Sequence, residues 1–393
     1  MRITFVNRSA GIFWGGGETF DLEVARAFIR LGHDVQFVIG RRLWRVDLPM
    51  TEFPTTYVRT LLFPWLYNRV AASQSLLMNR IGWRVELLEC EVFERNAFKR
   101  IATNGIARHT DIFQLSGWPR LGAWIKEALN AKSVIMWHGP APIWTGIFFG
   151  RETSGPKVRD WNERCSATLA AGDSFVAVKN NADPRVVEIP IGVNTDRFRP
   201  KPADGIRNRY HIPQDSVVFV FVGRMIHIKN LPFLIESFAS ALQQNPLLYL
   251  LLVGDGPAKP DLIEQSNRLN VRERVIFAGM QTGSKLVDHY NASDVFVITS
   301  TYESFSFVVL EAMACELPVI ATRVGRLPQS VDDGRTGLLV ESGSVENLKA
   351  SILAMAGDKA RRRDMGRCGR EKVVQKHSWL ETARQMLRVY ESL

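Results

Sequence analysis

The sequence has few of the features that mark membrane, secreted or metal-binding proteins. Its longest apolar runs, such as "LLYLLLVG", are far shorter than the ~18–20 residues of a membrane-spanning helix. "MRITFVN" enters a strand pattern directly and has no apolar signal-peptide core. We therefore expect a cytoplasmic protein. The four cysteines form no CxxC or Cys/His pairing, which disfavours a disulfide framework or a zinc site; they are Cys90, Cys165, Cys315 and Cys368.

A concentrated basic segment of the kind that binds nucleic acid is also lacking. The net charge of +10 comes from 50 basic and 40 acidic residues, which are spread over both halves of the chain. One local exception runs from Tyr57 to Val85, where arginines occur without any acidic residue. We expect no nucleic-acid partner.

Short β-type runs alternate with amphipathic helical runs along nearly the whole chain. In the first half the expected strands are "RITFVN", "DVQFVIG", "DIFQLSG", "SVIMWHG" and "FVAVK". In the second half they are "VVFVFVG", "LYLLLVG", "VIFAG", "VFVITS", "PVIAT" and "GLLV". Continuously apolar strands that alternate with helices are typical of parallel sheets covered on both faces. The sequence therefore predicts an α/β protein with two Rossmann-like, doubly wound parallel-sheet domains.

The length of 393 residues also favours two domains over one. The join is expected in "VVEIPIGVNTDRFRPKPADG", where proline and glycine cluster and the strand and helix periods both lapse. We place the first domain at 1–195, with a variable region at 41–110, and the second domain at 196–375.

"TYESFSFVVLEAMA" places Glu303 and Glu311 on either side of a strand-to-helix junction. Ser306 is predicted as the N-cap of a helix that begins near Phe307. Ligands of parallel sheets gather at such carboxyl ends, and a helix N-terminus suits a phosphate. A sugar nucleotide, with phosphates between two hydroxyl-rich rings, fits this arrangement. The alternative is that Glu303 is a solvated loop residue and Glu311 an exposed helix position.

Other strand ends carry glycines and cations. Gly223, Arg224 and Lys229 follow one strand, and the two cations precede a helix, so they could neutralise a diphosphate. Gly254 lies in a further turn of this kind, "LLVGDGP". The glycines at 15–17 permit close approach to an anion or form a tight structural turn. They do not make GxGxxG and no acidic residue follows the second strand, so we expect no nicotinamide dinucleotide and no other cofactor.

The motifs at these strand ends carry a family resemblance. The chain resembles the GT-B glycosyltransferases of the large retaining family 4 over nearly everything outside residues 41–110. The likeness is most specific in "GRMIHIKN", "LLVGDGP", "YESFSFVVLEAMACELPVIAT" and "VDDGRTGLLV". It implies two domains that face a central cleft, with a last helix at 376–393 that returns to the first domain.

The resemblance implies a role for each matching residue. Arg224 and Lys229 would hold the donor diphosphate, Glu311 the ribose hydroxyls and Glu303 the hydroxyls of the donor sugar. His138 matches a histidine that the family places near the donor sugar, whereas its spacing alone favours a packed histidine at a strand end. The implied donor-binding residues are Gly16, Gly17, Gly223, Gly254, Met280, Ser304, Phe305, Ser306, Phe307 and Glu311.

Some positions depart from the family pattern. Ser304 and Ser306 stand where glycines are commoner, and Ile228 precedes the lysine where an acid is frequent. None of these changes removes a charged group on which the implied roles depend. The resemblance implies transfer of a glycosyl group with retention, without a metal, and with the departing phosphate as the base. UDP is the expected nucleotide, with GDP and ADP open.

Residues 57–85 combine arginines with apolar and aromatic side chains and have two interpretations. In one, this segment enters an anionic membrane surface, so that the enzyme is peripheral and its acceptor a lipid or lipid-linked glycan of cell-surface polysaccharide or glycolipid synthesis. In the other, it is an elaborated loop whose aromatic residues pack on the first domain.

Two other functions are alternatives to the transferase. A sugar-nucleotide epimerase could share the architecture but needs acid and base groups that the motifs do not supply. A non-catalytic scaffold subunit is disfavoured because the charged ligand-facing residues are present, although fold alone does not exclude it.

Overall fold

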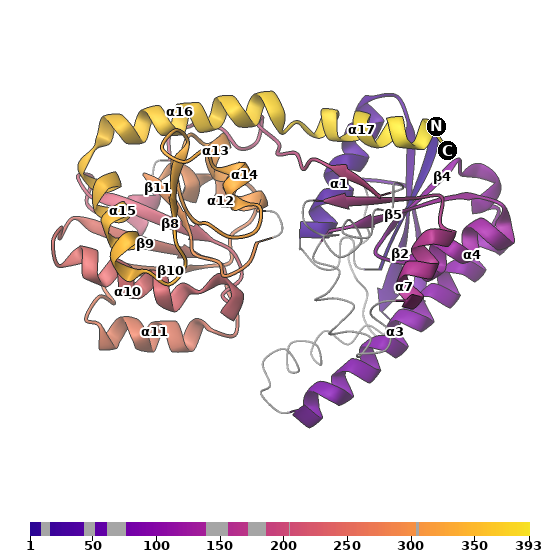
Figure 1. Ribbon diagram of the computed structural model, residues 1–393, viewed down its shortest axis with the longest axis horizontal. Coiled ribbons are helices and arrows are strands. Elements are labelled where there is room, and N and C mark those ends of the chain that lie inside the picture. Colours follow the sequence, from indigo (N-terminus) through magenta and orange to yellow (C-terminus); the bar gives the residue numbers. More distant parts are fainter. Residues whose placement is uncertain are drawn as a thin grey trace. The chain divides into compact units, whose positions relative to one another are not determined.

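The computed structural model describes residues 1–8, 16–42, 52–60, 76–138, 156–171, 186–203, 205–303 and 306–393. The chain divides into two compact units. The first comprises Met1–Ile191 and Trp379–Leu393, and the second comprises Gly192–Ser378. The first unit is therefore completed by the C-terminal end of the chain, which carries helix α17 (Trp379–Glu391; Figure 1).

In the described residues of the first unit, the sheet has seven strands in the order β3-β2-β1-β4-β5-β6-β7. All its pairings are parallel. The strands are β1 (Arg2–Asn7), β2 (Asp34–Arg42), β3 (Thr55–Thr60), β4 (Ile112–Ser116), β5 (Lys132–Trp137), β6 (Ala167–Ala171) and β7 (Val186–Ile189). The order reverses direction between β1 and β4, as in a doubly wound sheet.

Helices cover both faces of this first sheet. An apolar cluster on one face joins the strands to α3 (Leu76–Thr103), α4 (Pro119–Leu129) and α7 (Pro156–Arg164), with the 3-10 helix η1 (Ile106–His109) beside them. On the other face lie α1 (Gly16–Arg30) and α17, where Phe28 contacts Phe5 and Tyr390. Tyr390 also donates a hydrogen bond to Gln114 of β4 at 2.6 Å, which fixes α17 to the first sheet.

The second unit contains six parallel strands in the order β10-β9-β8-β11-β12-β13. They are β8 (Val217–Val222), β9 (Leu248–Val253), β10 (Val275–Gly279), β11 (Val295–Ile298), β12 (Val319–Thr322) and β13 (Gly337–Val340). The helices are α9 (Ile206–Arg209), η3 (His227–Lys229), α10 (Leu231–Leu242), α11 (Lys259–Arg268), α12 (Gly283–Asn291), α13 (Phe307–Ala314), α14 (Leu327–Ser330), α15 (Val345–Gly357) and α16 (Lys359–Lys376).

Alternating side chains of β8 show how both faces of this sheet are buried. Val218 and Val220 belong to an apolar cluster with residues of α12, α13 and α16. Phe219 and Phe221 point to the opposite face and pack with residues of α10, α11 and α15. This two-sided burial explains why the strands of the second unit are continuously apolar.

The structure corrects one sequence prediction near the join. Val186–Ile189 was assigned to the connecting segment, but it forms strand β7 at the edge of the first sheet. Neighbouring β6, Ala167–Ala171, was not predicted, because its small residues give a weak strand pattern. The predicted strand "FVAVK" at 175–179 lies outside the described residues.

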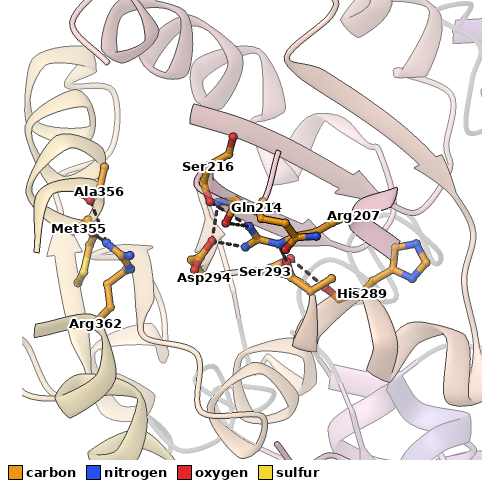
Figure 2. Close-up of polar contacts among 11 residues, drawn as sticks. Arg207, Gln214, Ser216, His289, Ser293, Asp294, Met355, Ala356 and Arg362 are labelled. Atoms are coloured by element: carbon orange, nitrogen blue, oxygen red, sulfur yellow. Dashed lines mark hydrogen bonds and ion pairs between the residues drawn. The ribbon is translucent and has the colours of Figure 1, made fainter. Parts of the chain in front are cut away.

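Arg207 closes the amino edge of the second sheet (Figure 2). Its guanidinium donates to the carbonyl of Ser216 at 3.0 Å and to Asp294 Oδ2 at 2.7 Å. The same carboxylate oxygen accepts from the backbone of Val218 at 2.8 Å. Ser216 and Asp294 immediately precede β8 and β11, so this ion pair fastens the two central strands at their start. The opposite, carboxyl edge carries the predicted site.

Candidate functional site

Lys229 and Glu303 form an ion pair at the carboxyl edge of the second sheet. Lys229 Nζ lies 2.6 Å from Glu303 Oε2, and both side chains are largely buried. Lys229 follows β8 through η3, and Glu303 follows β11. Because β8 and β11 are the neighbours between which the strand order reverses, the pair lies at the switch point where doubly wound sheets bind ligands.

Backbone contacts hold the turn that carries Glu303. Thr301 N donates to the carbonyl of Ile228 at 2.9 Å, which ties this turn to the segment of Lys229. Arg326 N donates to the carbonyl of Glu303 at 3.0 Å. The adjacent Gly325 has a φ of +50°, and a Cβ there would lie 2.0 Å from the Glu303 carbonyl oxygen. Only glycine permits this approach, so Gly325 is a structural requirement of the site that the sequence did not reveal.

Two predicted glycines, Gly223 and Gly254, lie against each other at the ends of β8 and β9. Their φ angles are +154° and +138°, and a Cβ on Gly254 would lie 1.9 Å from the Gly223 carbonyl oxygen. Gly254 N donates to the carbonyl of Gly279 at 2.9 Å. The contact between the backbones of two neighbouring turns therefore requires glycine at Gly254 even without a ligand.

Two further predicted residues on this unit are exposed. Arg224 follows Gly223 and, among the described residues, forms no ion pair or side-chain hydrogen bond. Met280 follows β10 and is 70% exposed, which is unusual for a large apolar side chain. Both side chains are thus accessible to a ligand at this edge.

Helix α13 begins where the sequence predicted. Ser306 is its N-cap with extended backbone, but its side chain makes no capping hydrogen bond. The hydroxyl is buried and has no hydrogen-bond partner within the described part of the chain. Phe307 is the first helical residue. The predicted Ser304 and Phe305 lie outside the described residues.

Glu311 of α13 is held by a tyrosine that the sequence did not single out. The hydroxyl of Tyr290, on α12, donates to Glu311 Oε2 at 2.9 Å. Tyr290 is fully buried, and burial, followed by the negative charge of Glu311, raises the pKa of its hydroxyl well above the ordinary value. The tyrosine therefore stays protonated and fixes the direction of the carboxylate. Tyr290 lies outside the motifs at the strand ends, so no pattern in the sequence singles it out.

The remaining predicted residues belong to the first unit. Gly16 is the first residue of α1, and His138 directly follows β5. A Cβ on Gly17 would lie 3.0 Å from His138 Cδ2, so helix and histidine are in close contact. His138 Nε2 lies 3.4 Å from Oδ1 of Asp21, a buried carboxylate on α1 that the sequence analysis missed.

The arginine-containing segment 57–85 is described only in part. Its start belongs to β3 and its end to α3, while residues 61–75 lie outside the described residues. None of the described helices is both long enough and apolar enough to cross a membrane. Within the same residues, no three His, Cys, Asp or Glu side chains gather as metal ligands would.

The sequence is similar to one family model and to several known proteins. Residues 203–372 match the family model of glycosyl transferases group 1. A D-inositol 3-phosphate glycosyltransferase from Kineococcus radiotolerans is 34% identical over 281 residues, which cover 66% of this chain and 63% of that protein. A protein described in the same way from Saccharomonospora viridis is 34% identical over 57% of this chain and 54% of its own length. The chain thus spans between about half and two thirds of these relatives.

Solved structures share the fold along the whole chain. Sucrose-phosphate synthase from Thermosynechococcus elongatus has a TM-score of 0.78 at 23% identity, and covers 100% of this chain and 98% of its own. HepE from Anabaena, solved with UDP and glucose, has a TM-score of 0.78 at 18% identity, and covers 100% of both chains. The fold is that of the GT-B glycosyltransferases. The family-model match thus concerns residues 203–372, and the likeness to the solved structures concerns the fold.

The paired residues of the second unit lie within the range that matches the group 1 family model. Lys229, Glu303, Tyr290 and Glu311 all lie between residues 203 and 372. Asp21 and His138 lie outside that range, in the part of the chain where sequence motifs are weaker.

Proposed function

We propose that this protein is a retaining, metal-independent glycosyltransferase. It moves a sugar from a nucleotide diphosphate sugar, with UDP as the expected nucleotide, to a hydroxyl of a glycan or lipid-linked acceptor. The observation that carries the proposal is the Lys229–Glu303 pair of 2.6 Å at the switch point of the second sheet. The group 1 match over residues 203–372 supports it.

The described groups suit the parts of a nucleotide sugar. Lys229 and the exposed Arg224 supply positive charge for the diphosphate, and the N-terminus of α13 supplies backbone N–H groups. Glu311, oriented by Tyr290, would accept hydrogen bonds from the ribose hydroxyls. Glu303, with one oxygen on Lys229, would use its other oxygen for a sugar hydroxyl. The two cations thereby share the diphosphate, and each carboxylate has its own set of hydroxyls on the donor.

Charge stabilisation at the leaving group is the proposed source of catalysis. The bond between the anomeric carbon and the phosphate oxygen breaks, and the acceptor oxygen bonds to that carbon on the same face. The acceptor proton passes to the departing phosphate. Lys229 lowers the barrier because negative charge grows on the phosphate as the bond breaks.

A thermal-shift panel of UDP, GDP, ADP, TDP and NAD on the purified protein tests the donor class. A nucleotide at ~100 times its dissociation constant adds about 2.7 kcal/mol of stability, which raises the melting temperature by a few degrees. We expect one nucleoside diphosphate, UDP, to stand out and NAD to have no effect. No shift with any of the five would contradict the proposal and favour a non-catalytic scaffold.

Product analysis separates the transferase from an epimerase. Incubation with UDP-sugars and a membrane extract as the acceptor source should release UDP and label an extract component. An epimerase would instead return an altered nucleotide sugar and release no nucleotide.

We also propose that segment 57–85 contributes to acceptor recognition at an anionic membrane surface. Co-sedimentation with anionic and with neutral vesicles tests this part separately. Binding to anionic vesicles alone is expected, and binding to neither would refute it while leaving the donor assignment intact.

A further inference from the structure

Asp21 is a buried carboxylate at the switch point of the first sheet. It lies on α1, the helix that follows β1, and its exposed fraction is 0%. Its Oδ2 accepts hydrogen bonds from Asn7 Nδ2 at 2.7 Å and from the hydroxyl of Ser116. Asn7 ends β1 and Ser116 ends β4, and the strand order reverses between these two strands. The carboxylate therefore occupies the place where this type of sheet binds ligands.

The other carboxylate oxygen has an incomplete environment. Asp21 Oδ1 is buried and has no hydrogen-bond partner within the described residues. His138 Nε2 is also buried and, in the same residues, also lacks one. These two atoms face each other at 3.4 Å. Leaving a buried carboxylate oxygen unpaired is costly, so the imidazole N–H is the natural donor to it.

Neighbouring groups confine the ring of His138. The ring centroid of Phe20 lies 4.9 Å away, and a Cβ on Gly17 would lie 3.0 Å from His138 Cδ2, closer than side chains usually approach. Hydrogen bonds in unliganded active sites are often long and shorten when substrate binds. The distance of 3.4 Å between His138 Nε2 and Asp21 Oδ1 fits such a hydrogen bond, because the ring of His138 is confined.

We propose that Asp21 is a positioning residue for His138: Oδ1 accepts from Nε2–H and thereby directs Nδ1 toward the bound substrate. Among the described residues nothing hydrogen-bonds to Nδ1, which leaves that nitrogen for a ligand. The catalytic consequence rests on the proposed function, because it assumes that His138 meets the reacting sugars. The geometric part, the hydrogen bond itself, can be tested without any substrate.

Asp21→Asn is a sharp test because the neighbours of Asp21 fix how the new amide must lie. Asn7 donates toward Oδ2, so the amide oxygen of the variant must occupy that side. Its NH₂ group then points at His138 Nε2. Two donors cannot face each other, so the imidazole must lose its Nε2 proton and carry the proton on Nδ1 instead.

Nitrogen-15 NMR of the imidazole reports this change directly. Spectra of ¹⁵N-histidine-labelled protein are recorded at pH ~9, well above the ordinary histidine pKa of ~6.5, and His138 is assigned by its loss in His138→Gln. The wild type should show a proton on Nε2, and Asp21→Asn should show it on Nδ1 only. An Nε2 proton retained in the variant, or absent from the wild type, would overturn the proposal. A merely structural carboxylate would leave the tautomer unchanged.

The matched control is Glu23→Gln, which makes the same carboxylate-to-amide change on the same helix. Glu23 pairs with Arg26 at 2.6 Å and has no contact with His138 among the described residues. It should leave the His138 spectrum unaltered. Melting curves of both variants show whether either change unfolds the protein.

Kinetics then test the catalytic consequence. Asp21→Asn should lower kcat by roughly 10–100-fold, as loss of a hydrogen bond to a functional histidine often does, with little change in KM for the donor. Combined with His138→Ala, it should cause no further loss, because both changes remove the same interaction. Additive losses would contradict the coupling.

The two proposals fail in different ways. If the wild type binds no nucleotide, the proposed function fails, and the NMR result still decides whether Asp21 holds His138. If nucleotide binds normally but Asp21→Asn leaves both the tautomer and kcat unchanged, only the role of Asp21 is wrong.

Discussion

At the switch point of the second sheet a lysine meets a glutamate at 2.6 Å, whereas at that of the first sheet a buried aspartate faces a histidine at 3.4 Å. The Lys229–Glu303 pair retains some exposure, and Glu303 is further bonded by Ser300 at 3.0 Å. Asp21 is fully buried: one oxygen accepts two hydrogen bonds, and the other has no hydrogen-bond partner among the described residues and lies 3.4 Å from His138 Nε2. The same topology thus supports a charged, accessible pair in one unit and a confined positioning pair in the other.

The carboxyl edges of the two sheets are built differently. In the second unit Lys229 and Glu303 lie in the loops that follow β8 and β11, and contacts between backbones, such as that of Gly254 with Gly223, fix the turns at this edge. In the first unit the aspartate comes from the interior of a helix and reaches its partners through side chains. Substitutions at the edge of the second sheet should therefore act by removing a charge or changing the geometry of a turn. At the edge of the first sheet, the loss of one hydrogen bond should be enough to change function.

The largest effect is expected from Lys229→Ala. Removal of the cation leaves Glu303 without its ion-pair partner Lys229 and removes stabilisation of the leaving phosphate, so turnover should fall by roughly 10²–10³-fold. The measurement is release of UDP from the donor under saturating conditions. Lys349→Ala is the matched control, since Lys349 pairs with Glu346 at 3.2 Å on α15 of the same unit. Near-normal turnover in Lys229→Ala would show that the lysine charge at the edge of the second sheet is not needed for catalysis.

Gly254→Ala tests the claim that backbone contact builds the second edge. The new Cβ would lie 1.9 Å from the Gly223 carbonyl oxygen at a φ of +138°, so we expect a loss of about 3 kcal/mol. This corresponds to a fall of roughly 6–12 °C in melting temperature. Gly357→Ala, where a Cβ would meet nothing within 4 Å, should leave the melting temperature nearly unchanged. Equal stability of the two variants would show that the turns can separate freely.

Tyr290→Phe and Tyr390→Phe remove one hydroxyl from each unit. Tyr290→Phe removes the hydrogen bond to Glu311 Oε2 and should weaken UDP binding by roughly 5–10-fold, which corresponds to about 1–1.4 kcal/mol. The same substitution should not change the affinity for 2′,3′-dideoxy-UDP, because that nucleotide has no ribose hydroxyls for Glu311 to bind. Tyr390→Phe breaks the bond to Gln114 and should lower stability without changing UDP affinity. Calorimetry measures the affinity of each variant for UDP and for 2′,3′-dideoxy-UDP. If Tyr290→Phe weakened the binding of both nucleotides equally, Glu311 would have no role at the ribose.

The smallest effect concerns pH and His289 of the second unit. Burial lowers the pKa of this histidine below its ordinary value of 6.5, and in the folded state its Nε2 lies 3.2 Å from the Tyr210 hydroxyl. Between the lowered folded pKa and 6.5 the unfolded chain binds a proton that the folded chain does not. The stability that neutral His289 contributes is therefore complete above pH 6.5 and is lost as the pH falls through the folded pKa.

His289→Gln cannot titrate and should flatten this pH dependence. The slope it removes is at most about 1.4 kcal/mol per pH unit, since a single proton is involved. Urea unfolding between pH ~5 and ~7 measures it. Burial also lowers the pKa of His33 in the first unit, so part of the slope should remain. If His289→Gln kept the full wild-type slope of unfolding free energy against pH, other groups would account for the whole pH dependence.

Local patterns in the sequence predicted most of the strands and the charged residues of the second edge. A buried parallel strand is a continuous apolar run, and a residue directly after it must lie at the carboxyl edge of the sheet. This is why Lys229, Glu303 and Glu311 could be selected without coordinates. Prediction failed where the pattern is weak, as for the small residues of β6 and for β7 beside the join.

The sequence by itself determined the two parallel sheets, their charged strand ends and the start of α13. Only the tertiary structure decided which side chains meet: Asp21 with His138, 117 positions later, and Tyr290 with Glu311 across two helices. The physical reason is that burial and hydrogen bonding depend on atoms brought together by folding, whereas propensity and periodicity describe only neighbours along the chain. A carboxylate on a helix can look solvated in the sequence and still be the most enclosed charge at its edge of the sheet.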